Sequence, residues 1–282
     1  MTATDWTAIA GPLDIRLVVA DMDGTLLDEH SRIPEEFWGV LDRLRARGVE
    51  FVPASGRQYA TLRAMFADRA GGELSYIAEN GNVVAADGRI VEVHGVGFDL
   101  ARRVIGMVND AVASGAHDIG LVVCGLASAY VQRADEAFVA ECRKYYAALE
   151  IVDDLYAVLD NADETILKLA IFDFADAEAM AADLLGDISR DHQVVVSGAH
   201  WVDIMNPDAD KRRGVEALQR DLGVSRPQTA VFGDYLNDLE MLGAGDYSFA
   251  MGNAHPALKE AARYIAPSNA DHGVLAVLDR LV

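Results

Sequence analysis

The stretch RLVVADMDGT, residues 16–25, joins a short apolar run to a polar turn. Its apolar part is rich in β-branched residues and ends at Asp21, and a run of this kind predicts a strand buried in a parallel sheet. The glycine of DMDGT permits a sharp turn directly after that strand. We therefore expect Asp21 and Asp23 to lie at the carboxyl end of a central strand.

Two similar strand patterns follow this first one. Residues 49–53 predict a buried strand that ends at the segment ASGR, and residues 75–78 predict another that ends at the segment ENG. Helical patterns cover 34–47 and the residues up to about 68, so the segments alternate as β-α-β-α-β. This order predicts an α/β fold with a doubly wound, mostly parallel sheet.

The same alternation returns in the last third of the chain. It predicts helices and strands at 210–222 (helix), 229–232 (strand), 236–242 (helix), 247–250 (strand), 255–262 (helix) and 273–281 (helix). The strand at 229–232 ends at Gly233 and Asp234, which again places an acidic residue at a strand end. The two α/β segments together predict one core domain, residues 1–84 and 206–282.

The intervening residues 85–205 have a different pattern. They begin within a predicted hairpin at 82–93 and then mix helices with paired strands, which predicts an inserted α+β cap domain with an antiparallel sheet. The expected elements are 99–114 (helix), 119–123 and 128–131 (strands), 134–147 (helix), 165–172 (strand), 176–188 (helix), and 192–197 and 201–205 (strands). Two linkers, near Ala85 and Asn206, can act as a pair of hinges for a lid.

The charge of the chain restricts its partners. With 45 acidic and 24 basic residues the formal net charge is −21, a field that repels nucleic acid and anionic membranes, so we expect neither as a partner. The alternative is that the acidity only keeps the protein soluble and has no further role. The N-terminal residues lack the features of a signal peptide, and no apolar run reaches membrane length, so a cytoplasmic protein is expected. Cys124 and Cys142 lack metal-site spacing.

Polar clusters at the predicted strand ends carry the candidate chemistry. Ligands bind at the carboxyl ends of strands in open α/β sheets, so clusters far apart in sequence can form one pocket. The predicted cluster residues are Asp21, Asp23, Ser55, Arg57, Asp234, Asn237 and Asp238, joined by Lys211 at the start of the helix after the insert.

Four carboxylates in one pocket would repel one another. A divalent cation relieves this repulsion, and oxygen-only ligands favour Mg²⁺. Lys211 adds the positive charge that a phosphoryl group needs against the acidic background. A DxDG motif alone could also be a plain turn or a calcium loop, but the ordered set of clusters favours a catalytic site.

These residues resemble the motifs of the haloacid dehalogenase superfamily. DMDGTLL is similar to its first motif, Ser55 to its second, Lys211 to its third and GDYLNDLEML to its fourth. The segments AENGN and AMGNA resemble those of the Cof-type phosphatases. The insert lies between the second and third motifs, which resembles the type-II cap of that group.

The resemblance implies a magnesium-dependent phosphatase that acts on small phosphorylated metabolites, with sugar phosphates as the family default. Asp21 would form an aspartyl-phosphate, and Asp23 would serve as general acid and then general base. The other implied roles are phosphoryl binding by Ser55 and Lys211, substrate binding by Arg57, Asn80, Gly81 and Asn237, and metal binding by Asp21, Asp23 through its backbone carbonyl, and Asp234, with Asp238 orienting the metal's water shell or Lys211.

One departure from the family pattern concerns the residue after Lys211. The family often has glycine there, whereas this chain has Arg212 and Arg213 before Gly214. Lys211 still begins the predicted helix, so its assignment stands, and we expect Arg212 to face solvent.

Other functions remain open at this stage. A dehalogenase is disfavoured because it would not need Asp23 as an acid. A sugar phosphomutase and a non-catalytic phosphometabolite sensor both fit the motifs. A monomer or a homodimer is expected.

Within the insert, at least one of Lys168, Ser197 and His200 is predicted to face the leaving group. Lys168 is the favoured candidate, because its charge would attract an anionic substrate. The alternative is that Lys168 lies on the solvent face of the cap sheet.

Overall fold

The computed structural model describes residues 3–197, 199–208 and 210–281, and the chain divides into two compact units. The first, here called the core unit, comprises Met1–Val93 and Asp210–Val282; the second, the inserted unit, is His94–Ala209. The sequence pattern placed the first boundary at residue 84. The structure places it after Val93, because the hairpin before that point pairs with the core sheet.

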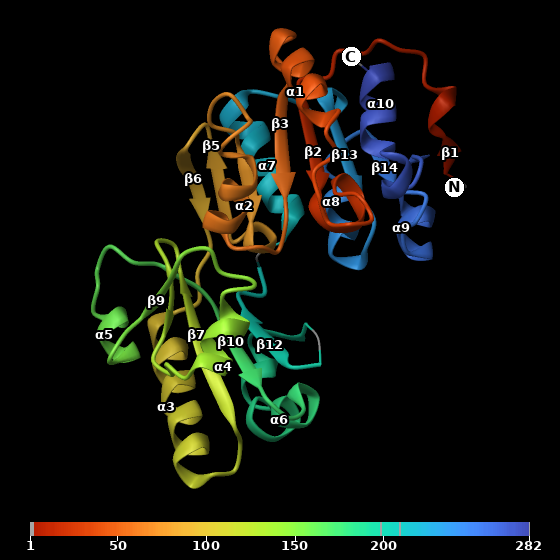
Figure 1. Cartoon of the computed structure of the whole chain (residues 1–282). Coiled ribbons are helices and arrows are strands. Elements are labelled where there is room, and N and C mark those ends of the chain that lie inside the picture. The colour runs from red at the N-terminus through yellow and green to blue at the C-terminus, as the bar shows by residue number, and fades with distance from the viewer. Residues whose placement is uncertain (1–2, 198, 209, 282) are drawn as a thin grey trace. The chain divides into compact units, whose positions relative to one another are not determined.

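The core unit contains a nine-stranded sheet in the order β1-β15-β14-β13-β2-β3-β4-β5-β6 (Figure 1). All pairs from β1 to β4 are parallel, and the hairpin β5–β6 is antiparallel. The strands are β1 (Thr4–Asp5), β2 (Leu17–Asp21), β3 (Glu50–Ala54), β4 (Tyr76–Ala78), β5 (Val83–Ala86), β6 (Arg89–Val93), β13 (Thr229–Gly233), β14 (Tyr247–Ala250) and β15 (Tyr264–Ile265). The predicted doubly wound, mostly parallel sheet is confirmed.

Helices cover this sheet in two groups. They are α1 (Phe37–Ala46), α2 (Tyr59–Phe66), α7 (Lys211–Leu222), α8 (Leu239–Leu242), α9 (Pro256–Ala261) and α10 (Gly273–Leu281). Helix α1 packs against α10, and α7 packs against α8. The first helix starts at Phe37 rather than at residue 34, because Pro34 lies in a turn that the Phe37 N–H closes. Edge-to-face contacts of Phe37 with Phe51 and Phe66 join α1, β3 and α2.

Strand β2 lies between β3 and β13, at the point where the strand order reverses. It is fully buried along its length, as the continuous apolar run predicted. Its carboxyl end is Asp21, while β3 ends at Ala54 and β13 at Gly233. The three polar clusters therefore follow adjacent parallel strands and meet at one edge of the sheet.

The inserted unit contains a six-stranded sheet in the order β11-β12-β10-β7-β8-β9. The strands are β7 (Ile119–Gly125), β8 (Ala129–Val131), β9 (Leu149–Ile151), β10 (Ile166–Asp173), β11 (Gln193–Val196) and β12 (Trp201–Met205), and the helices are α3 (Phe98–Ser114), α4 (Glu136–Cys142), α5 (Leu155–Leu159) and α6 (Ala177–Leu184). All pairs are antiparallel except β8–β9, so the predicted α+β character is confirmed. The predicted helix at 134–147 is wrong in its second half, since α4 ends at Cys142.

Strand β10 carries a bulge between Ile166 and Lys168 that sets which side chains share a face. Beyond it, Leu169 and Ile171 pack in one apolar cluster with α3, α5 and α6, and Ala170 packs in the other cluster, with α4. By alternation, Lys168 lies on the α4 face. None of the helices in the described ranges is both long enough and apolar enough to cross a membrane.

Candidate active site

A buried ammonium group lies at the centre of the polar cluster. Lys211 is 1% exposed and is the first residue of α7, and its Nζ donates to Asp21 Oδ1 and, at 2.6 Å, to Asp238 Oδ1. A positive charge at a helix N-terminus opposes the helix dipole, and a buried charge loses its hydration. The two carboxylates offset both costs.

Two glycines bring the start of α7 close to the sheet. A Cβ on Gly81, whose φ is +100°, would lie 2.2 Å from the Asp210 carbonyl oxygen, and a Cβ on Gly214 would lie 2.8 Å from Ile77. The Asp210 carboxylate accepts from the Arg213 N–H at 2.8 Å and so caps the helix. Gly81, predicted as a substrate-binding residue, thus has a packing reason to be glycine.

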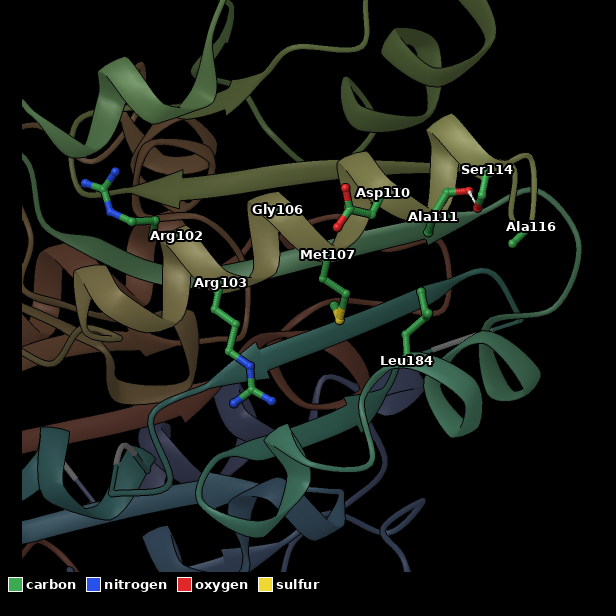
Figure 2. Close-up of a pocket in the computed structure, with 9 residues that line it drawn as sticks. All are labelled: Arg102, Arg103, Gly106, Met107, Asp110, Ala111, Ser114, Ala116 and Leu184. Atoms are coloured by element: carbon green, nitrogen blue, oxygen red, sulfur yellow. Dashed lines mark hydrogen bonds between the residues drawn. The ribbon is translucent and has the colours of Figure 1, made fainter.

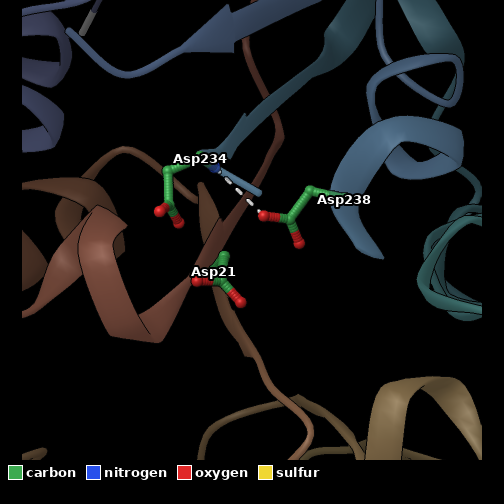
Figure 3. A group of neighbouring side chains, drawn as sticks. All are labelled: Asp21, Asp234 and Asp238. Carbon is green, nitrogen blue, oxygen red and sulfur yellow. Dashed lines mark hydrogen bonds between the residues drawn. The ribbon is translucent and has the colours of Figure 1, made fainter. Parts of the chain in front are cut away.

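Three carboxylates converge beside Lys211. Atoms of Asp21, Asp234 and Asp238 that could ligate a metal all lie within 4.8 Å of one another, and Figure 3 shows the three side chains grouped together. The second oxygen of Asp238 accepts from the backbone N–H groups of Asp234 (3.0 Å) and Tyr235 (3.3 Å). Both oxygens of Asp238 are therefore engaged, whereas within the described part of the chain Asp21 and Asp234 each keep an oxygen for another partner.

Burial shifts the proton affinities of these groups. It raises the pKa of Asp21 well above its usual range, and the Asp238 carboxylate raises it further against the opposing effect of Lys211. Burial likewise raises the pKa of Asp234 to about 6. For Lys211, burial favours the neutral amine, but the Asp21 and Asp238 carboxylates outweigh it and raise the pKa. The cluster needs more positive charge than Lys211 supplies.

The donor set fits a hard divalent cation. Three carboxylates and no histidine or cysteine make an oxygen-only site, the kind that Mg²⁺ prefers. Since Asp238 is engaged by Lys211 and two N–H groups, Asp21 and Asp234 are the better ligand candidates, and Asp238 positions Lys211.

Asp23 lies outside this buried group. Its side chain is 54% exposed, and both of its oxygens accept from Arg57, at 3.0 Å from Nε and 2.6 Å from Nη2. The sequence predicted both residues for the site but not their two-point ion pair. Exposed ion pairs of this kind contribute about 0–1 kcal/mol to stability.

The remaining predicted residues of the core line the same edge. Ser55 is buried, and its Oγ accepts from the Arg57 N–H at 3.2 Å. Asn80 lies next to Asn237, whose Nδ2 donates to Asn80 Oδ1 at 3.4 Å. A Cβ on Gly56 would lie 2.9 Å from Asn80 Nδ2, so this glycine allows the loops after β3 and β4 to approach closely.

Two residues that fix the site were not predicted. Thr25 donates through Oγ1 to Asp234 Oδ1 at 2.9 Å, and Asn253 donates through Nδ2 to the Gly24 carbonyl at 2.8 Å. A Cβ on Gly24 would lie 2.3 Å from Asp234 Oδ2, so the turn requires glycine. Both donors lie in segments that resemble motifs of the family, DMDGT and AMGNA. This resemblance is the signal from which the two residues could have been predicted.

The departure at Arg212 leaves the site intact. Arg212 is exposed and its Nε donates to Glu216 at 2.8 Å, one turn along α7. This agrees with the expectation that Arg212 faces solvent.

The candidates of the inserted unit lie in different surroundings. Lys168 is only 7% exposed, with its Nζ 3.7 Å from Asp203 Oδ1 and 6.0 Å from the ring centre of Tyr146, so the solvent-face alternative is wrong. Ser197 and His200 are exposed, and residue 198 lies outside the described part. The His200 Nδ1 donates to the Asp173 carbonyl at 2.8 Å.

A hollow of about 690 Å³ lies on the inserted unit, between α3 and α6, and its lining includes basic and apolar side chains. Figure 2 shows Met107 pointing toward Leu184 there, with Arg103 beside it on α3.

Within the described ranges, the one group of three or more residues suited to a metal is that of Asp21, Asp234 and Asp238. We therefore take the sheet edge of the core unit as the candidate active site.

Known proteins resemble the chain over nearly its full length. A family model described as haloacid dehalogenase-like hydrolase matches residues 18–278. The 5-amino-6-(5-phospho-D-ribitylamino)uracil phosphatase of Escherichia coli is 32% identical over 273 residues, which is 96% of this chain and 97% of that protein. Phosphoglycolate phosphatase 1 of Saccharolobus solfataricus is 24% identical, over 95% of this chain and 96% of that one.

The fold is also shared with solved structures. A Thermotoga maritima protein superposes with a TM-score of 0.84 at 23% identity, covering 95% of this chain and 98% of its own. At this identity the likeness concerns the fold.

The buried ion cluster predicts a large stability effect at Lys211. In metal-free buffer, Lys211→Ala should lower the free energy of unfolding by about 3–5 kcal/mol, because two buried carboxylates lose their counter-charge. Arg212→Ala, the neighbouring exposed control, should change it by less than about 1 kcal/mol. Urea unfolding at neutral pH measures both. Equal effects of the two substitutions would contradict the ion-cluster account.

Proposed function

The chain belongs to the haloacid dehalogenase-like hydrolases and is a Cof-type phosphatase, and from this premise we propose that it hydrolyses small phosphorylated metabolites through an aspartyl-phosphate on Asp21. The observation that carries the proposal is the position of the Asp21 carboxylate. It ends the central strand at the reversal of strand order, beside the buried Lys211 ammonium, with a second oxygen left for another partner.

In the proposed reaction an Asp21 oxygen attacks phosphorus and the bond to the leaving oxygen breaks. Asp23 gives a proton to that leaving oxygen and then takes one from the water that hydrolyses the aspartyl-phosphate. Asp23 lies two residues beyond Asp21 on the same turn, which keeps it near the reacting group. Its side chain is exposed, so it can exchange protons with water. Ser55 and Lys211 hold phosphoryl oxygens as they gain charge.

The amide side chains of Asn80 and Asn237 lie together at this edge, and we assign them to phosphate or substrate contacts. Arg57 is assigned to the same group because its guanidinium pairs with Asp23, two residues beyond Asp21. Gly81 is assigned to the packing of the loop against α7.

Mg²⁺ is the proposed cofactor. Asp21, Asp234 and the Asp23 backbone carbonyl would hold it, and Asp238 would position Lys211 and the surrounding water. When bound, the cation supplies positive charge that favours the ionised form of Asp21 and offsets the charge of the phosphoryl group.

A sugar or sugar-alcohol phosphate is the proposed substrate class. The Escherichia coli relative is named for a substrate with a phosphorylated ribityl chain. In the inserted unit we assign leaving-group recognition to Lys168, because its ammonium and the Asp203 carboxylate 3.7 Å away offer a donor and an acceptor for hydroxyl groups. A cytoplasmic location and a monomeric or homodimeric state stay predictions.

The nucleophile is tested by Asp21→Asn, which keeps the shape but removes the attacking charge. Turnover of an aryl phosphate with Mg²⁺ should fall at least about a thousandfold. The protein should remain folded, because Asp238 still pairs with the Lys211 ammonium. Asp246→Asn, at a half-exposed bend of the core unit before β14, is the control and should keep wild-type turnover. Near wild-type turnover by Asp21→Asn would disprove the proposed mechanism.

The raised pKa of Asp234 predicts a pH-dependent affinity for Mg²⁺. Below its pKa of about 6 the carboxyl is protonated, so Mg²⁺ must displace a proton. Titration calorimetry should show affinity falling by about tenfold per pH unit below that pH. Asp234→Asn should bind weakly without this step, while Asp246→Asn should retain it. A flat affinity across that pH would remove Asp234 from the ligand set.

Lys168→Ala tests the leaving-group assignment. It should raise KM for the best sugar phosphate by about 10- to 100-fold, the cost of a lost hydrogen bond from a charged group. Turnover of a small aryl phosphate should stay unchanged, because that substrate makes few contacts beyond its phosphate. Lys144→Ala, an exposed lysine of the same unit, is the control. If both substrates respond alike, Lys168 does not recognise the leaving group.

A further inference from the structure

The ion pair between Arg57 and Asp23 has two hydrogen bonds, and it affects when Asp23 can serve as an acid or a base. Among the described residues, Arg57 is the side chain that donates to the Asp23 oxygens, and it occupies both of them. Each of these oxygens can accept a second hydrogen bond, but both face the guanidinium rather than a leaving group. We therefore expect the ion pair to open during a turnover in which Asp23 serves as acid and base.

The pair is built so that it can open. Asp23 is 54% exposed and the Arg57 side chain 34%, so water competes for both groups and lowers the cost of an exchange of partners. The Arg57 backbone, in contrast, is fixed: its N–H donates to Ser55 Oγ and its carbonyl accepts from the Glu79 N–H at 3.1 Å. Only side-chain torsions need to change.

A phosphoryl group is a direct competitor for the same guanidinium. The planar fork of arginine binds carboxylates and phosphates with the same two-point geometry, and a phosphate ester carries more negative charge than one carboxylate. Arg57 follows Ser55, the proposed phosphoryl ligand, by two residues, and the Asp21 charge acts on it as well. Phosphate arriving at Asp21 thus lies within the electrostatic reach of Arg57.

We propose that Arg57 is a positioning residue that exchanges Asp23 for the substrate phosphoryl group. Binding of phosphate takes the guanidinium away from Asp23 and leaves that carboxyl free to face the leaving oxygen. Arrival of substrate and release of the acid–base residue are then one event. This inference rests on the proposed aspartyl-phosphate function, because it needs phosphate to bind at Asp21.

The exchange predicts that Asp23 and inorganic phosphate compete for Arg57. In calorimetry with inorganic phosphate in Mg²⁺ buffer, Asp23→Asn should bind phosphate about two- to fivefold tighter than wild type, because the competing charge is gone. Arg57→Ala should bind about tenfold weaker. In the double variant, Asp23→Asn should bring no further gain, because the guanidinium that mediates the competition is missing.

The controls separate this competition from general effects. Arg63→Ala removes an exposed arginine of α2 that pairs with Glu73 and should leave phosphate binding unchanged. Arg57→Lys keeps the charge without the fork, so its phosphate affinity should lie between those of wild type and Arg57→Ala. It also serves if Arg57→Ala proves unstable in a circular dichroism melt.

Two results would overturn the exchange. If Asp23→Asn tightens phosphate binding equally with and without Arg57, the gain is a general charge effect and Arg57 mediates nothing. If Asp23→Asn does not tighten binding at all, Arg57 does not leave Asp23. Failure of the proposed function looks different: wild type and Arg63→Ala would then release no phosphate from an aryl ester and bind no inorganic phosphate.

Discussion

The ammonium group of Lys211, buried between Asp21 and Asp238, is the interaction on which the rest of the site depends. It lies at the N-terminus of α7, where the helix dipole disfavours a cation, and it has lost almost all contact with water. Such a placement is stable only if carboxylates surround it. The same carboxylates repel one another, and Lys211 alone does not balance their charge, so a further cation is needed. The carboxylates that stabilise the buried Lys211 are therefore also the reason for the proposed Mg²⁺.

The scaffold holds these charges through backbone geometry. Adjacent parallel strands deliver Asp21 and Asp234 to one sheet edge, while Gly81 and Gly214 let the start of α7 approach that edge closely. Thr25 then orients Asp234. The groups that must stay in place are buried and bonded on several sides, whereas Asp23, which has to exchange protons, is exposed and held by a single side chain.

The sequence predicted the core well because each of its signals is local. An apolar run followed by an acidic turn marks a strand end, and the order of such ends places Asp21, Lys211 and Asp234 together. The pairing of Asp23 with Arg57 joins two loops through side-chain torsions, which no local pattern encodes. In the inserted unit, the bulge in β10 shifts the alternation that decides the surroundings of Lys168, and β9 is too short to show a periodic signal.

The central claim is that phosphate passes through a covalent bond to Asp21. The direct measurement is a rapid quench of the enzyme during turnover of an aryl phosphate with Mg²⁺, followed by borohydride reduction and peptide mapping. Borohydride reduces an acyl phosphate to an alcohol, so the account predicts homoserine at position 21 in samples quenched during turnover and none in enzyme without substrate. Asp23→Asn should raise the yield, since it slows hydrolysis of the aspartyl-phosphate. Steady release of phosphate with unmodified Asp21 in every sample, or homoserine at another aspartate, would contradict the account.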